Sequence, residues 1–299
     1  MRTDLISLAR MLRANVYVAP PLPIQGPDGR SMGTWSPISC TLIHGSDSAI
    51  LVDTPITTMQ TNALADWIER TIPRKKLVAV YITHGHGDHF YGLPTLRKRF
   101  PGVKTYATQS TRDHMSDQLD PQFFHQTYDS RFPGQIDQQP PLTELVEVLP
   151  PSGELELEGH ILQAVEVGQA DTHSSTVLWV PDLRLAVCGD VVYGDCHQML
   201  AECTTSDLRA AWIRSIEKVE SLSPDIVIPG HKKEGEVDGI WHLKETKEYI
   251  QTFDELITTG KAKSARELTS YMLEKYPNRF NPGALIMGSM AAFKSKSKI

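Results

Sequence analysis

Short apolar runs and helix-spaced apolar positions succeed one another along this chain. Apolar runs rich in β-branched residues, each bounded by turn residues, predict strands at 15–20, 38–44, 49–54, 77–83, 103–108, 144–149, 153–159, 160–167, 175–181, 183–189 and 225–231. Apolar positions three or four residues apart predict helices at 58–71, 93–100, 110–119, 207–221, 241–258 and 264–276. Strands and helices without a break in composition indicate one α/β domain over residues 1–299.

Three segments need separate treatment. Residues 1–15 carry Asp4 and an arginine within their apolar part, so they are a poor signal peptide and predict a short amphipathic helix. An aromatic and proline-rich insertion at about 115–143 lacks periodicity, which is typical of a functional or mobile segment. Residues 238–296 are predicted to be mostly helical. The serines predicted to begin helices as N-caps are Ser110, Ser206 and Ser264.

Composition narrows the classes of partner. The 299 residues include 30 Lys+Arg and 36 Asp+Glu, a net charge of -6, which argues against a nucleic-acid partner. No apolar run approaches about 18 residues, so no transmembrane helix and no membrane partner are expected. Four cysteines without CxxC spacing are too few for a disulfide framework, and a reducing cytoplasm is the expected compartment. The sequence leaves the oligomeric state undecided between a monomer and a homodimer.

A cluster of ligand-type side chains follows the continuously apolar strand predicted at 77–83. The segment Thr83-His-Gly-His-Gly-Asp-His89 holds four such residues, His84, His86, Asp88 and His89. Glycines at 85 and 87 are expected to give the backbone the φ values that this turn needs. Imidazole with carboxylate suits zinc or iron, whereas calcium and magnesium prefer oxygen ligands. The alternative is a chance cluster of solvated polar residues.

The HGHGDH segment after an apolar strand resembles the His-x-His-x-Asp-His signature of the metallo-β-lactamase superfamily. That pattern continues with a third histidine, a bridging aspartate and a last histidine, and the chain offers His173, Asp190 and His231 in this order beside predicted strands. The similarity spans about residues 14–231. It implies a four-layer αβ/βα sandwich of two mixed β-sheets flanked by helices, with metals at one edge between the sheets.

The resemblance also implies a dinuclear site for two Zn²⁺ ions, with iron or manganese as alternatives. Two such ions share a water whose pKa falls from 15.7 toward about 7, and the resulting bridging hydroxide attacks a carbonyl. Asp88 would also orient the nucleophile and pass its proton to the leaving group. The implied ligands are His84, His86 and His173 for one ion and Asp88, His89 and His231 for the other, with Asp190 bridging.

Departures from the family pattern narrow the reaction. The commonest zinc β-lactamases have a cysteine at the position of Asp190, and His86 argues against a di-iron oxygen-reducing centre. The segment 168–173 keeps only the outline of the Gly-His-Thr-x-Gly-His found in lactonases and glyoxalase II. Tyr193 lies three residues after Asp190, as in lactonases of this superfamily, where its phenol would donate a hydrogen bond to the developing oxyanion. The alternative is a packed aromatic side chain.

Other residues are weaker candidates for the site. His125 lies among the aromatic residues of the insertion, which either wall the metal cleft for a small apolar or aromatic substrate or anchor a long loop. His197, after Tyr193, is a candidate pocket residue. Asp53 is expected to support the metal loop by hydrogen bonding.

Together these features predict a zinc-dependent hydrolase that opens a small lactam or lactone. Two alternatives remain. A thioester hydrolase resembling glyoxalase II would need a basic glutathione anchor, for which Lys261, Lys263 and Arg266 are candidates. A mononuclear iron dioxygenase of the persulfide type resembles the same motif, and metal analysis separates it from a hydrolase.

Overall fold

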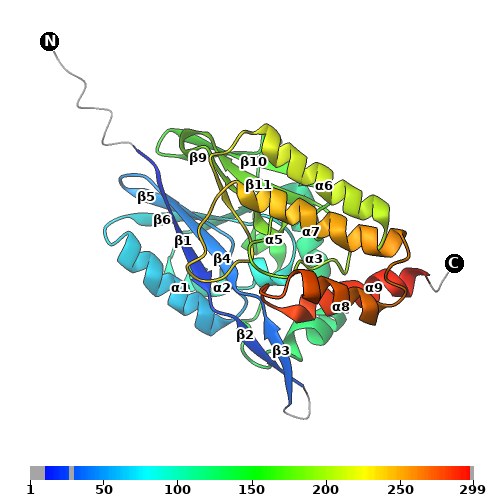
Figure 1. The fold of residues 1–299 in the computed structure, drawn as a ribbon. Helices are drawn as coiled ribbons and strands as arrows, with labels where there is room; N and C mark the ends of the chain where they lie inside the picture. Colours follow the sequence, from blue (N-terminus) through cyan, green and yellow to red (C-terminus); the bar gives the residue numbers. More distant parts are fainter. Residues whose placement is uncertain (1–10, 27–29, 297–299) are drawn as a thin grey trace.

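Two β-sheets lie face to face between two layers of helices in the computed structural model, which describes residues 11–26 and 30–296 (Figure 1). The first sheet consists of β1 Arg13–Ala19, β4 Ile38–His44, β5 Ser48–Val52, β6 Lys76–Tyr81, β7 Lys104–Ala107 and β8 Glu147–Val148. Its strand order is β1-β4-β5-β6-β7-β8. The pairs β1–β4 and β4–β5 are antiparallel, whereas the pairs from β5 to β8 are parallel.

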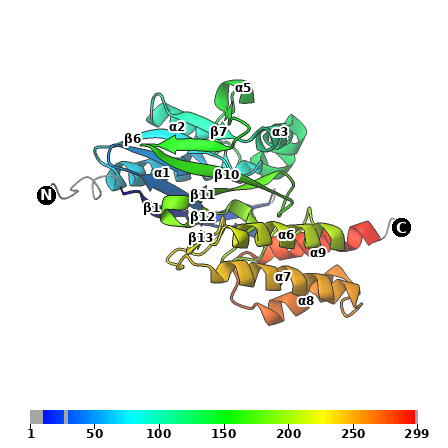
Figure 2. The same ribbon diagram turned by 90° about the horizontal axis from the view of Figure 1, so that it is seen from above.

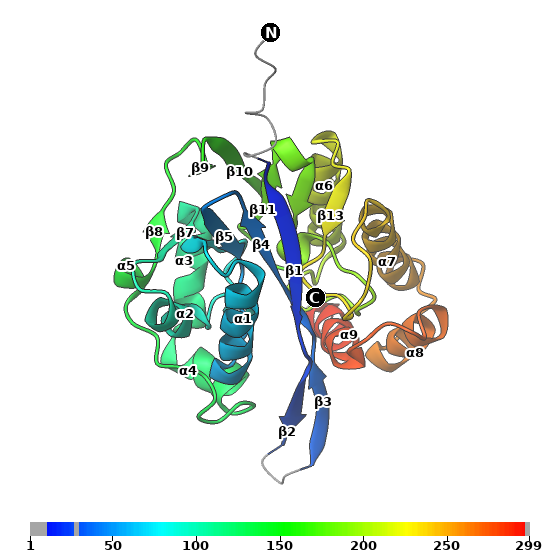
Figure 3. The same cartoon turned by 90° about the vertical axis from the view of Figure 1, so that its left-hand side faces the viewer.

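The second sheet is mixed as well. Its strands are β9 Glu154–Leu157, β10 His160–Gly168, β11 Ser175–Val180, β12 Leu185–Val187 and β13 Ile226–Ile228. They follow the order β13-β12-β11-β10-β9, and only the pair of β12 and β13 is parallel. A hairpin of β2 Leu22–Gln25 and β3 Ser31–Trp35 extends beyond the two sheets (Figure 3).

Helices cover both outer faces of this pair of sheets (Figures 2 and 3). On the side of the first sheet lie α1 Thr58–Thr71, α2 Leu93–Arg99 and α3 Gln109–Gln118. On the side of the second sheet lie α6 Ser206–Ser221, α7 Trp241–Thr258, α8 Ala265–Lys275 and α9 Pro282–Lys296. Short helical segments are α4 Pro121–Phe124, α5 Leu142–Leu145 and single turns at Gly87–His89, His125–Asp129, Pro181–Leu183 and Gly189–Val191.

Three buried apolar clusters correspond to the three interfaces between these four layers. One joins α1 and α2 to the first sheet and contains, for example, Leu64 of α1 and Leu42 of β4. Another joins α6 and α7 to the second sheet through residues such as Trp212. The third lies between the sheets and contains Ile50 of β5 and Leu178 of β11. Burial on both faces explains the apolar strands, and the predicted four-layer sandwich is confirmed.

The structure corrects several local predictions. The helix expected over residues 1–15 lies largely outside the described residues, and β1 already begins at Arg13. Thr108 and Thr205, rather than Ser110 and Ser206, cap α3 and α6, because their hydroxyl oxygens accept hydrogen bonds from backbone N–H groups three residues later. Ser264 caps α8 as predicted.

The region around the insertion also departs from its prediction. The strand expected at 144–149 shrinks to Glu147–Val148, because the preceding residues form α5. The insertion contains α4, whose first N–H groups donate to the carboxylate of Asp120, and a helical turn at His125–Asp129. The described part of the chain has no helix with both the length and the apolar character needed to cross a membrane.

Candidate metal centre

The HGHGDH loop lies directly after β6, where Asp53 at the end of β5 holds it. Asp53 accepts hydrogen bonds from the backbone N–H of Thr83 at 2.9 Å and from its hydroxyl at 2.8 Å. Its Oδ2 also lies 3.0 Å from Nδ1 of His89. Asp53 adopts a left-handed φ of 61°, which lets one carboxylate reach both residues. This is the supporting contact expected of Asp53.

Glycines in this loop are needed for close approach rather than for unusual φ values. Neither Gly85 nor Gly87 has the positive φ expected from the sequence. A Cβ at Gly85 would lie 2.4 Å from Nδ1 of His114, and one at Gly87 would lie 2.2 Å from Cε2 of Tyr91. The two glycines therefore let α3 and an aromatic ring pack against the loop.

The structure brings His84 and His86 together with Asp171. One potential ligand atom from each of these three residues, the first donor group, lies within 4.8 Å of the others. Nδ1 of His86 is 2.9 Å from Oδ2 of Asp171. His173, predicted to complete this group, is exposed and instead lies near His114 and Asp117 of α3.

The displacement of His173 has a local backbone cause. Ser174 adopts a left-handed φ of 58°, and its carbonyl oxygen accepts a hydrogen bond from the hydroxyl of Thr111 in α3. The turn buries Asp171 and Thr172 and leaves His173 at the surface, where its ring packs at a tilt against His114 with ring centroids 4.3 Å apart. The acidic residue two positions earlier therefore occupies the place expected for the histidine.

Asp88, His89 and His231 form the second donor group, again with ligand atoms within 4.8 Å of one another. His231 follows β13, and its Nδ1 donates to the carbonyl oxygen of Pro37 at 2.7 Å, so Nε2 faces the carboxylates. Oδ1 of Asp190 lies 3.2 Å from Nε2 of His89, and Oδ2 lies 3.1 Å from Nε2 of His231.

Asp190 also connects the two groups. It lies with His84 and His89 in a further cluster of ligand atoms within 4.8 Å. The phenol of Tyr193 donates a 2.5 Å hydrogen bond to Oδ2 of Asp190, and burial, together with the charge of Asp190, raises the pKa of Tyr193 well above its usual value. Tyr193 is 1% exposed, so its hydroxyl is held by Asp190 in the structure.

Buried atoms without hydrogen-bond partners show that these residues fit a metal ion. Nε2 of His84 is buried and has no hydrogen-bond partner. Nε2 of His89, Oδ2 of Asp171 and Oδ1 of Asp190 have polar neighbours at 2.9–3.2 Å but no contact with hydrogen-bond geometry. Burying a polar atom without a hydrogen bond costs about 1–3 kcal/mol. Imidazole nitrogens and carboxylate oxygens converging in this way are the donors that zinc and iron take.

Electrostatics at the site also favour a cation. Burial and the neighbouring His89 hold the pKa of His84 well below its usual value, which keeps its imidazole neutral. Burial raises the pKa of Asp171 to about 6. Burial opposes ionisation of Asp190 too, but His231 and His89 hold its pKa well below the usual range. Burial opposes protonation of His86, His89 and His231, but the neighbouring carboxylates raise the pKa of each of these imidazoles. The buried negative charge therefore draws positive charge to this site, which a metal ion would also supply.

Comparison with known proteins decides the family. The model of the metallo-beta-lactamase superfamily matches residues 33–231. This chain belongs to the metallo-β-lactamase superfamily. It is 27% identical over 220 residues to a metallo-beta-lactamase type 2 of Bacteroides fragilis, covering 72% of this chain and 78% of the relative. A relative of the same name from Bacillus cereus is 24% identical over 236 residues, covering 78% and 79%.

Solved metallo-β-lactamases share the fold. The enzyme from Pontibacter korlensis superposes with a TM-score of 0.55 at 17% identity, over 81% of this chain and 99% of that one. FIM-1 from Pseudomonas aeruginosa, in a mono-zinc form, gives 0.53 at 17% identity, over 83% and 94%. The superfamily and the sequence relatives support a metal-dependent hydrolase.

Two residues near the donor groups carry no local sequence signal. Glu202 lies before α6, and its Oε1 is 3.1 Å from Nε2 of His86. Trp35, at the end of β3, donates from its indole to Oδ2 of Asp88 at 2.8 Å. They stand 116 and 53 positions from their partners, so only the tertiary fold reveals them.

The insertion lies against the metal loop and is partly an anchor. Tyr128 and Phe132 are 3% and 1% exposed, and both pack against Trp35. The hydroxyl of Tyr128 accepts a hydrogen bond from the backbone N–H of Gly87 at 3.1 Å. His125 points away from this packing, since it is exposed and pairs with Asp129. The anchoring interpretation therefore holds for the buried aromatic residues.

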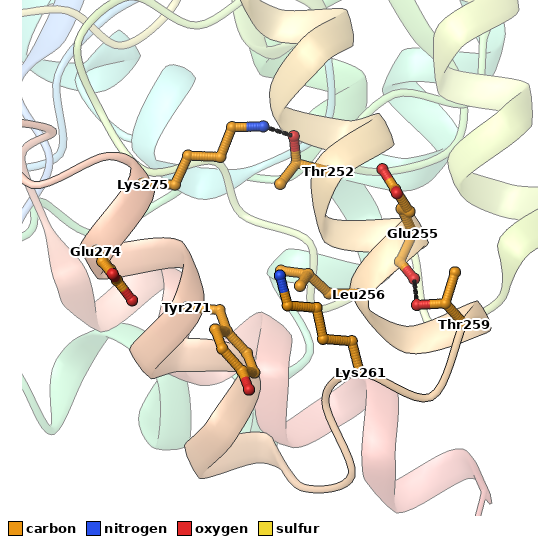
Figure 4. Close-up of a pocket in the computed structure, with 8 residues that line it drawn as sticks. All are labelled: Thr252, Glu255, Leu256, Thr259, Lys261, Tyr271, Glu274 and Lys275. Atoms are coloured by element: carbon orange, nitrogen blue, oxygen red, sulfur yellow. Dashed lines mark hydrogen bonds between the residues drawn. The ribbon is translucent and has the colours of Figure 1, made fainter.

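Two further predicted positions lie outside the donor groups. His197 is buried, with Nδ1 2.8 Å from the hydroxyl of Tyr249 in α7. A groove of about 640 Å³ lies between α7 and α8 (Figure 4). In it, Nζ of Lys261 lies 5.1 Å from the ring centroid of Tyr271. None of its eight lining residues belongs to either donor group.

Proposed function

We propose that this chain is a dinuclear metallohydrolase that opens a small cyclic amide or ester. The observation that carries the proposal is the arrangement of two donor groups around Asp190. The first donor group would hold one ion and the second donor group the other, with Asp190 between them. When bound, two such ions supply a water of lowered pKa and polarise the carbonyl under attack.

The residues around this centre have distinct tasks. Asp88 is held at Oδ2 by Trp35, and it would pass the proton of the nucleophile to the leaving group. Tyr193 is assigned to orienting Asp190, because its buried hydroxyl already donates to that carboxylate. If Tyr193→Phe leaves turnover unchanged, Tyr193 contributes only to packing.

The class of substrate follows from the relatives and from one departure. The curated relatives are metallo-beta-lactamases, which favours a cyclic amide. Asp190, at the position where the commonest zinc β-lactamases have cysteine, favours extending the class to lactones. A small apolar or aromatic substrate suits the partly buried indole of Trp35, which lies beside Asp88.

The test is a substrate screen with the zinc-loaded protein. Lactams, lactones and glutathione thioesters are compared in one assay, and ring opening of a lactam or lactone is expected. Turnover of thioesters alone would identify a glyoxalase II-like enzyme instead. In that case Lys261, which lines the groove between α7 and α8, becomes the first residue to substitute.

One observation favours a second candidate function. Two histidines and one carboxylate in the first donor group form the donor set typical of non-haem iron(II) oxygenases. A mononuclear iron dioxygenase would contain one iron per chain and consume oxygen. Two zinc ions per chain with no oxygen uptake support the hydrolase.

A further inference from the structure

We propose that Glu202 is a positioning residue that determines which atoms of His86 and Asp171 face the metal. This inference rests on the proposed function, because it concerns the first donor group of the same centre. Glu202 is not itself a member of that group, and its side chain is 45% exposed, against 14% for His86. Glu202 therefore lies on the more exposed side of His86, where its carboxylate clusters with His86 and His114.

The first step concerns the ring of His86. Its Nδ1 lies 2.9 Å from Asp171, on the side of the first donor group, and its Nε2 lies 3.1 Å from Oε1 of Glu202. A neutral imidazole carries one proton, and the nitrogen that keeps it cannot bind a metal. Glu202 accepts a hydrogen bond from Nε2–H, so Nε2 keeps its proton and Nδ1, beside Asp171, is the nitrogen that is left to bind a metal.

The second step concerns the carboxylate of Asp171. Oε2 of Glu202 accepts a hydrogen bond from the hydroxyl of Thr172 at 2.6 Å. The backbone N–H of Thr172 donates to Oδ1 of Asp171 at 2.8 Å, and Oδ2 lies 2.9 Å from Nδ1 of His86. Glu202 thus holds Thr172, and Thr172 orients the carboxylate of Asp171 so that its second oxygen faces His86.

The third step concerns the backbone that carries Glu202. The neighbouring Cys203 is buried, with its thiol 3.0 Å from the carbonyl oxygen of Ala170. The guanidinium of Arg209 in α6 donates to the carbonyl oxygen of Cys203 at 2.8 Å. These contacts hold the segment before α6 against the loop that contains Asp171, so Glu202 is placed by the fold.

Residues that orient a metal ligand in this way typically change metal affinity 10- to 100-fold. We therefore expect Glu202→Ala to weaken one of two metal-binding events by about that factor and to leave the other within about twofold. Glu202→Gln keeps an oxygen that accepts from Nε2–H, so its loss should be smaller. Thr172→Val removes only the link to Asp171 and should also give an intermediate loss.

The experiment is a chelator-competition titration with Zn²⁺ and Co²⁺ on the full chain, read by metal stoichiometry and by the visible absorption of Co²⁺. Asp129→Asn is the matched control, because the exposed His125–Asp129 pair belongs to neither donor group. Circular dichroism and the melting temperature of the metal-free variants verify the fold. If Glu202→Ala fails to fold, Glu202→Gln and Thr172→Val provide the same comparison.

The outcomes separate the two proposals. The positioning role is supported if the affinity for one metal ion falls more in Glu202→Ala than in Glu202→Gln and stays unchanged in Asp129→Asn. Two unchanged affinities in folded Glu202→Ala and Thr172→Val overturn it while leaving the metallohydrolase intact. A wild-type chain that takes up no metal overturns both proposals.

Discussion

The indole Nε1 of Trp35 donates a hydrogen bond to Oδ2 of Asp88 at 2.8 Å. Trp35 ends the strand β3 of the projecting hairpin, and Asp88 lies in the loop after β6, so this contact ties the hairpin to the second donor group. Tyr128 and Phe132 of the insertion pack on the same indole, with ring centroids 5.5 and 5.8 Å away. Three separate segments therefore determine the orientation of Asp88.

Replacing Trp35 by Phe should test this dependence, because an aromatic ring remains in place while the indole N–H donor is lost. We expect stability to fall by about 1.5–3 kcal/mol and turnover to fall by roughly tenfold, since a hydrogen bond to a charged group is lost. Thermal unfolding and steady-state kinetics on the metal-loaded protein measure the two effects. Trp67→Phe, whose ring packs on Tyr17 away from the donor groups, is the control. Equal kinetics in both variants would contradict the prediction.

Asp171 and His173 offer a direct choice between two ligands two residues apart. Asp171→Ala should remove about one of two metal ions and lower turnover by roughly 100-fold or more, because the first donor group then lacks its carboxylate beside His86. His173→Ala should keep both ions, since His173 is exposed and packs against His114 outside both donor groups. Metal per chain after exhaustive dialysis measures the difference. The reverse pattern would restore the histidine to the first donor group.

Gly85 lies against His114, and Gly85→Ala should destabilise the protein by about 1–3 kcal/mol, the usual cost of overpacking. The added Cβ would stand 2.4 Å from Nδ1 and 2.5 Å from Cγ of His114, so one of the two segments must move. In Gly85→Ala with His114→Ala the clash partner is gone, and the two losses should be less than additive. Strict additivity in chemical denaturation would show that the contact is not limiting.

Glu158, in the turn between β9 and β10 of the second sheet, connects that turn to the loop before β5 in the first sheet. Its carboxylate accepts hydrogen bonds from three backbone N–H groups and one hydroxyl, between 2.7 and 2.8 Å, in the segment 46–48. Burial opposes ionisation, but these donors lower the pKa of Glu158 from 4.5 to about 2. A lowered carboxyl pKa stabilises the folded state above pH 4.5, and this contribution is lost as the pH falls toward 2.

Glu158→Gln should therefore lower the free energy of unfolding by about 1–2 kcal/mol at neutral pH. The difference from wild type should shrink between pH 4.5 and 2, because protonation of Glu158 then removes the same charge. Urea unfolding across this range measures it. Glu156→Gln, on the exposed side of β9, is the matched control. A difference that stays constant down to pH 2 would contradict the assignment.

Much of the architecture could be predicted because burial dictates the sequence pattern. Strands such as 38–44 are buried on both faces, since helices cover one side and the second sheet the other. Helix starts were less predictable, because neighbouring Ser and Thr residues can each act as the N-cap. Thr108 caps α3 instead of Ser110, since its hydroxyl oxygen accepts a hydrogen bond from the backbone N–H of Thr111. Short segments such as α5 depend on tertiary packing that no local pattern reports.

The site was predictable where ligand type and spacing coincide. His84, His86, Asp88 and His89 follow a strand in one short loop, and Asp190 and His231 follow β12 and β13, so the fold gathers them at one edge. The pattern assigned the third position to His173, whereas the structure places Asp171 beside His84 and His86, and both residues are of ligand type. Only the left-handed turn at Ser174 decides which of them faces inward.

The donors on either side of Asp190 come from positions as far apart as His84 and His231. No early fragment of the chain contains a complete donor group, since Asp171 and His231 follow the first half of the sequence. Bringing such distant segments together is slow and occurs only once the two sheets have met. Tight metal capture would therefore be a late event in folding, and a metal-sensitive absorption signal would report the arrival of the native topology rather than local structure.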